Sequence, residues 1–126
     1  MDENPNCPFC NMPSERVLYE SNLFFVIEDG FPVSSGHCLI ISKQHKKTFF
    51  DLSKKEHQEL VELISHTKNL IATKHSPDGH NIGMNCDEAA GQTVMHFHCH
   101  VIPRYVGDME DPRGGVRYCI PDKGSY

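Results

Sequence analysis

Apolar residues occur in short runs along the first third of the chain. Val17–Tyr19 and Leu23–Ile27 are β-prone runs, and the polar pair Ser21-Asn22 between them predicts a hairpin. A loop rich in Pro, Ser and Gly follows, after which His37–Ile41 predicts a third strand. Each run has the length of a strand and is too short for a helix.

The hydrophobic period changes in the middle of the chain. From Leu60 to Ile71 apolar residues recur three and four positions apart, which predicts a helix with one apolar face. Ser53 and Glu56 fit a capping box, so we expect the helix to begin just after Ser53. The run Ser76-Pro77-Asp78-Gly79 is expected to end it.

Two more strands are predicted after the helix, Asn81–Cys86 and Met95–Pro103, with the small-residue loop Asp87–Gly91 between them. The order β-β-β-α-β-β predicts an α+β fold, an antiparallel sheet with one long helix packed on it. The residues from Arg104 onward are expected to be mostly irregular. The 126 residues predict a single domain over 1–126, with a C-terminal tail over 106–126.

Composition and charge exclude several classes of function. Twelve basic and 17 acidic residues give a net charge of −5, which argues against nucleic acid as the partner. No apolar run reaches the length that spans a bilayer, so no membrane association is expected. The acidic start at residues 1–5 does not resemble a secretory signal, which predicts a cytoplasmic protein. We expect the six cysteines to be reduced rather than joined in a disulfide framework.

Three histidines alternate with apolar residues in the last predicted strand. Because alternate residues of a strand share a face, His96, His98 and His100 are expected on one side and Phe97, Cys99 and Val101 on the other. Three imidazoles in a row can bind a metal, provide a nucleophile or bind phosphate. Amide and hydroxyl groups nearby, in Asn85 and Gly91-Gln92-Thr93, suit an anion such as phosphate.

The motif His96-x-His98-x-His100, preceded by Gly91-Gln92-Thr93-Val94, resembles the histidine triad (HIT) family of nucleotide hydrolases and transferases. The resemblance extends from Cys7 to about Gly107. It implies an antiparallel meander sheet with one main helix, usually paired into a homodimer with a continuous sheet. It also implies cleavage of a purine nucleotide substrate at its α-phosphate. His98 would attack phosphorus and form a covalent nucleotidyl intermediate, which water then hydrolyses without a metal.

The same resemblance assigns roles to the other polar residues of the site. His100 would help His98 by binding the α-phosphate, and His37 matches an additional site histidine of the family. The expected substrate-binding residues are those for the phosphates and leaving group (Asn85, Gln92, Thr93), the ribose (Asp29) and the base (Phe9, Ile27).

A second set of residues resembles a structural zinc site of many microbial family members. Its ligands would be Cys7 and Cys10 of the Cys-x-x-Cys, His45, and His96. Two thiolates and two imidazoles form a closed tetrahedral set, which leaves no position for an activated water. Cys7 and Cys10 as a redox pair is the alternative, although the βαβ pattern typical of such pairs is missing.

The motifs leave several functions open. Gly-Gln-Thr-Val and Pro103-Arg104 resemble the fragile-histidine-triad branch, which hydrolyses dinucleoside polyphosphates such as diadenosine tetraphosphate, whereas Asn85 resembles the phosphoramidase (Hint) branch. Two other classes of function remain open. One is a purine-nucleotide-binding module with little turnover, and the other is a zinc-dependent hydrolase with the triad as metal ligands. In the tail, Arg113 and Arg117 flank two glycines and are hypothesised to reach the outer phosphates of a substrate.

Overall fold

The computed structural model describes residues 4–126, and residues 1–3 of the acidic start lie outside it. Within the described residues the elements are β1 (Val17–Glu20), β2 (Phe24–Glu28), β3 (Cys38–Ser42), α1 (Lys54–Ala72), β4 (Gly79–Gly83) and β5 (His98–Arg104), with short 3-10 turns between them. This order confirms the predicted α+β class.

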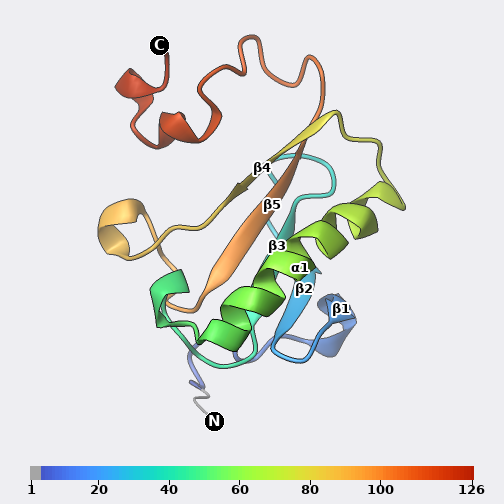
Figure 1. The fold of residues 1–126 in the computed structure, drawn as a ribbon, viewed down its shortest axis with the longest axis vertical. Coiled ribbons are helices and arrows are strands. Elements are labelled where there is room, and N and C mark those ends of the chain that lie inside the picture. Colours follow the sequence, from blue (N-terminus) through green and yellow to red (C-terminus); the bar gives the residue numbers. More distant parts are fainter. Residues whose placement is uncertain (1–3) are drawn as a thin grey trace.

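All neighbouring strands of the sheet are antiparallel, and their order is β1-β2-β3-β5-β4. The first three strands form the predicted meander. The helix then carries the chain to the far edge, where β4 forms, and β5 returns between β3 and β4. Figure 1 shows α1 lying across one face of this sheet, which leaves the opposite face for other groups.

The strands after the helix have different bounds from those predicted. β4 is Gly79–Gly83 rather than Asn81–Cys86, so Asn85 lies in the loop that follows it. β5 begins at His98 rather than Met95, so His96 precedes the strand. Pairing explains the difference, because Gly79 lies opposite Arg104 and Gly83 opposite His100. The N–H of Phe97, just before β5, bonds outside the sheet instead: it donates a hydrogen bond to the carbonyl of Lys46 at 2.6 Å.

The main core lies between α1 and the sheet. The predicted alternation in β5 is confirmed for the helix side, where the chain buries Phe97, Cys99 and Val101. The predicted capping box also forms: the Ser53 hydroxyl accepts from the Glu56 N–H, and the Glu56 carboxylate accepts from the Ser53 N–H. The helix buries one stripe against the sheet, made of Leu60, Leu63, Thr67 and Ile71.

Gly36 allows the loop between β2 and β3 to pack against the end of α1. Its φ of +91° lies in the left-handed region, and a Cβ there would come within 2.9 Å of the His75 ring. A larger residue would therefore push the loop away from the helix. Because His37 comes next in the chain, this close approach also sets the position of His37.

The residues beyond β5 form two short 3-10 helices, Gly115–Cys119 and Pro121–Lys123. Figure 1 shows this tail, in red, projecting past the end of β5. Among residues 4–126, no helix combines the length and apolar character needed to cross a membrane.

Candidate active site and metal centre

The sheet face opposite α1 brings two of the three triad histidines together over an apolar floor. His98 lies opposite Ile41 in the register of β5 and β3, and His100 lies opposite Leu39. Leu39, Ile41 and Ile27 form a second buried cluster, against which Phe9, Met12, Val17 and Phe25 pack. Sequence reasoning named Ile27 and Phe9 but missed Leu39 and Ile41. They could have been predicted from the two-residue period of β3, since residues 37, 39 and 41 share a face.

The ring of His98 is oriented by the main chain of the triad segment. Its Nδ1 lies 2.9 Å from the carbonyl oxygen of His96. A carbonyl only accepts, so Nδ1 must carry the proton and Nε2 of the neutral ring keeps its lone pair. The ring of Phe9 packs edge-on against His98, with centroids 5.0 Å apart. The arrangement leaves Nε2 of His98 as the potential nucleophile.

His37, His100 and Asp29 form a second polar group on the same face. His37 Nε2 lies 2.9 Å from His100 Nδ1 and 3.4 Å from the Asp29 carboxylate. Burial, helped by the neighbouring rings of His98 and His37, lowers the pKa of His100 to about 4. Burial also lowers the pKa of His37, against the attraction of Asp29. Both rings are therefore neutral at pH 7.

The expected phosphate-binding loop is held in shape by Gln92. This buried side chain accepts from the Asp87 N–H at 2.7 Å and donates to the carbonyls of Lys47 and Val94. Asp87 has a φ of +81°, uncommon for a residue with a side chain, and the bond from its N–H to Gln92 helps to hold it there. Gln92 thus positions the loop, and a direct contact of its amide with substrate stays a prediction.

Three other residues expected to contact substrate lie in loops around the site. Thr93 and Asn85 are both exposed, one before β5 and the other after β4. Asp29 lies next to the histidines and accepts the Phe31 N–H through its other carboxylate oxygen. Their roles toward phosphate, leaving group and ribose stay predictions.

The four expected metal ligands converge beside the triad. Cys7, Cys10, His45 and His96 each offer one ligand atom, and these atoms all lie within 4.8 Å of one another. The Nδ1 of His96 is 3.4 Å from the Cys7 sulfur and 3.1 Å from the His45 Nδ1. Its Nε2 lies 2.7 Å from the carbonyl of Ser42, which fixes the ring and turns Nδ1 toward the other three groups.

These residues fit a zinc ion. Zn–S bonds of about 2.3 Å and Zn–N bonds of about 2.0 Å in a tetrahedron place neighbouring ligand atoms roughly 3.3–3.8 Å apart. Four separations between ligand atoms of this cluster are 3.1–3.5 Å, close to that range. Burial lowers the pKa of His96, which favours the neutral imidazole that a metal requires. All four donors belong to the protein, so zinc here would be structural.

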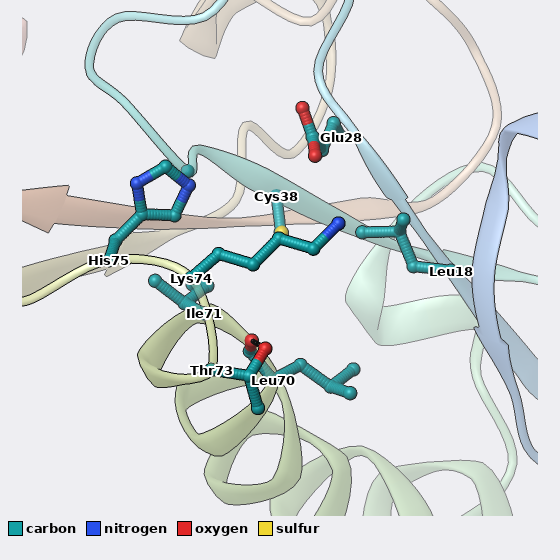
Figure 2. A pocket seen from close by; sticks show the side chains of 9 residues that line it. Leu18, Glu28, Cys38, Leu70, Ile71, Thr73, Lys74 and His75 are labelled. Carbon is teal, nitrogen blue, oxygen red and sulfur yellow. Dashed lines mark hydrogen bonds between the residues drawn. The ribbon is translucent and has the colours of Figure 1, made fainter.

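A hollow of about 150 Å³ lies on the other side of the sheet, between the end of α1 and strands β1–β3. Figure 2 shows the Lys74 side chain lying across it, with Cys38, Glu28 and His75 among the residues around it. Burial raises the pKa of Cys38 to about 11, so this thiol is not a nucleophile at neutral pH. No triad residue lines the hollow.

The two tail arginines interact within the tail. Arg113 pairs with Asp111, with a shortest distance of 3.0 Å. Arg117 donates to the carbonyl of Lys123 and lies over the ring of Tyr126, 4.7 Å from its centroid. If either arginine reaches an outer phosphate, these contacts must be exchanged for it.

Comparisons with known proteins agree with this architecture. A family model described as the HIT domain matches residues 12–107. The crystal structure of a HIT family protein from Bacillus anthracis is 35% identical, with a TM-score of 0.73, over 82% of this chain and 77% of that one. A zinc-bound histidine triad family protein from Mycobacterium smegmatis is 32% identical, with a TM-score of 0.74, over 84% of this chain and 80% of that one.

A further relative is named for its activity. The adenylylsulfatase HINT3 of Arabidopsis thaliana is 33% identical over 103 residues, which are 79% of this chain and 52% of that protein.

Proposed function

The chain belongs to the histidine triad family, and from this premise we propose that it is a nucleotidyl hydrolase acting through His98. The proposed substrates are dinucleoside polyphosphates such as diadenosine tetraphosphate, cleaved at the α-phosphate. The observation that supports this most directly is the hydrogen bond between His98 Nδ1 and the His96 carbonyl. It leaves the Nε2 nitrogen of His98 with a lone pair on the sheet face opposite α1, which a binding module would not require.

The proposed reaction has two displacements at the same phosphorus atom. In the first, the Nε2 lone pair of His98 attacks the α-phosphorus, and the bond to the leaving phosphate oxygen breaks with its electron pair. His98 then carries the nucleotidyl group and a positive charge, which the His96 carbonyl stabilises through Nδ1–H. In the second, water attacks phosphorus, the P–N bond electrons return to Nε2, and the water proton leaves with the product or solvent.

The neighbouring groups would bind the substrate around this nitrogen. His100, neutral and beside His98, would donate to the α-phosphate. The apolar cluster around Ile27, with Phe9 over it, would hold the purine, and Asp29 would accept the ribose hydroxyls. Thr93 and Asn85 are exposed in the loops near the site and would contact phosphate and leaving group.

We further propose structural zinc at Cys7, Cys10, His45 and His96, a homodimer, and a cytoplasmic location. The zinc proposal is supported by the converging ligand atoms and by the zinc-bound relative. Zinc would tie the N-terminal segment to the triad segment, while the phosphoryl transfer itself would use histidine alone.

A competition assay tests the substrate class. Equal concentrations of diadenosine tetraphosphate and adenosine phosphoramidate are given to the purified protein, and the products are resolved. We expect preferential cleavage of the polyphosphate to AMP and ATP. Preferential release of AMP and ammonia from the phosphoramidate would instead place the protein with the phosphoramidases, as Asn85 suggests.

Two variants complete this assay. His98→Ala should lose turnover of both substrates, whereas His66→Ala, an exposed position on α1, should keep it. If wild-type protein binds adenine nucleotides but releases no product from either substrate, the nucleotide-binding module is the better description. If His98→Ala keeps its turnover, the His98 mechanism is wrong.

A further inference from the structure

His98 and His100 have the same side chain on the same face of β5, with ring centroids 5.3 Å apart. The proposed reaction needs opposite properties from them: a lone pair on the Nε2 of His98 and a hydrogen-bond donor on His100. A neutral imidazole can place its proton on either nitrogen, so something beyond the side chain must decide. For His98 the His96 carbonyl decides.

For His100 the decision begins at a main-chain group in the loop between β2 and β3, four residues before His37. The backbone N–H of Val33 donates to Nδ1 of His37 at 3.0 Å. A backbone amide keeps its proton, so Nδ1 of His37 must be the acceptor. The His37 ring is 2% exposed, and its pKa is lowered by burial, so it is neutral and has its one proton on Nε2.

That proton determines the state of the next ring. His37 Nε2 lies 2.9 Å from Nδ1 of His100, so Nδ1 of His100 accepts and its own proton must be on Nε2. The Asp29 carboxylate lies 3.4 Å from His37 Nε2, and its negative charge favours a proton at that nitrogen. Its distance to His100 Nδ1, 3.9 Å, is too long for a competing hydrogen bond.

We propose that the backbone amide of Val33, acting through His37, fixes His100 as the Nε2–H tautomer and so makes it the donor beside the His98 nucleophile. Val33 and His37 are positioning residues in this scheme, and His100 is the group that contacts substrate. The two neighbouring histidines thus hold opposite tautomers, each imposed by a main-chain group. The role of His100 as a donor to substrate rests on the proposed hydrolase function, whereas the assignment of the tautomers does not.

Long-range ¹H–¹⁵N correlation spectra of histidine rings test the tautomers directly. The full chain, ¹⁵N-labelled at histidine and purified without chelator, is studied at pH 7.5, and signals are assigned by single substitutions. We expect the Nδ1–H pattern for His98 and the Nε2–H pattern for His37 and His100. An Nδ1–H pattern, or an averaged mixture, at His100 would overturn the proposal whether or not the protein is a hydrolase.

Matched substitutions at His37 test the chain of influence. Glutamine can accept from the Val33 N–H and donate to His100, whereas leucine of similar size can do neither. We expect that in His37→Leu the tautomer of His100 is no longer fixed. The variant should then have a kcat at least about tenfold lower with little change in KM, because the hydrogen-bond donor to the transition state is misaligned. His37→Gln should keep the Nε2–H pattern and lose far less kcat.

Three readouts separate this role from a structural one. His66→Leu, on the exposed side of α1, should change neither spectrum nor kcat. Melting temperatures identify a His37→Leu protein that has simply unfolded, in which case the His37→Gln spectrum still decides. If a folded His37→Leu protein keeps His100 as Nε2–H, Val33 and His37 do not set the tautomer. If the wild-type protein shows the expected tautomers but has no turnover, only the proposed hydrolase function is rejected.

Discussion

At the scale of single residues, the chemistry depends on which atom each histidine faces. Alternation in the sequence predicted that Phe97 and Cys99 would be buried and that His98 and His100 would share the other face. It could not predict that the His96 carbonyl and the Val33 amide meet the rings, because backbone groups have no sequence signal. The residue identities were therefore predictable here, whereas the particular main-chain groups that meet the rings needed the structure.

The lowered pKa of His100 links the site to stability. Burial lowers the pKa of His100 from its ordinary value of 6.5 to about 4 in the folded protein, so the unfolded chain binds the proton more readily. Stability therefore falls as the pH drops from 6.5 toward 4. We predict that His100→Asn loses less of its free energy of unfolding than wild type between pH 7.5 and 4.5.

Urea denaturation of both proteins at several pH values measures this difference. Both proteins retain the same proposed metal ligands, so acid effects on those ligands cancel in the comparison. Parallel pH curves for the two proteins would contradict the prediction.

At the scale of elements, the helix and the first three strands were predictable because each follows a clear hydrophobic period. The bounds of β4 and β5 were not, because they depend on pairing between distant segments. His96 in particular reads as part of a strand, yet it lies before β5 and bonds to the Ser42 carbonyl. The positions of the site residues before His98 are thus determined by the metal cluster and the Gln92 loop rather than by pairing in the sheet.

The start of α1 is connected to the triad segment. Glu56 at the first turn pairs with Lys46, whose carbonyl accepts the Phe97 N–H. We predict that Ser53→Ala, which removes the capping hydroxyl, lowers the free energy of unfolding by about 1 kcal/mol. Ser65→Ala, at an exposed position inside the helix, is the matched control, and denaturant titration should show no loss for it. Equal effects at both positions would exclude capping as the cause.

The metal cluster connects the N-terminal segment to the nucleophile. Phe9 lies between Cys7 and Cys10 and packs against the rings of both His96 and His98. Because metal binding adds to folding free energy, we predict that Cys10→Ser lowers the melting temperature by more than about 5 °C. The exposed Cys119→Ser should not change it.

Metal analysis gives the independent check on this cluster. Wild-type protein purified without chelator should contain about one zinc per chain, and Cys10→Ser should contain much less. Well under one zinc per chain in the wild type would reject the metal centre, whatever the melting temperatures show.

At the scale of the whole molecule, residues 108–126 of the tail lie outside the segment that the family model matches. The mostly irregular structure of the tail was predictable from the sequence, but the positions of its arginines were not, since no hydrophobic period determines where the tail packs. Arg113 pairs with Asp111 inside the tail. We propose that any contact of the tail with outer phosphates is made across the proposed homodimer.

This placement predicts a substrate-specific effect. If the proposed dimer brings the tail to the partner's site, Arg113→Ala should raise KM several-fold for diadenosine tetraphosphate and leave adenosine phosphoramidate unaffected. Lys55→Ala, an exposed cation on α1, is the control. Sedimentation equilibrium measures the dimer separately. A monomer, or unchanged kinetics in Arg113→Ala and Arg117→Ala, would rule out this role of the tail.

The central claim is that His98 becomes covalently bonded to the nucleotide during turnover. The most direct measurement is mass spectrometry of protein mixed briefly with diadenosine tetraphosphate and quenched in alkaline denaturant, because acid cleaves the P–N bond. We predict one adenylyl group per site, located on the peptide that contains His98 and absent from His98→Asn. Turnover without any such adduct, and equally fast in His98→Asn, would contradict the account.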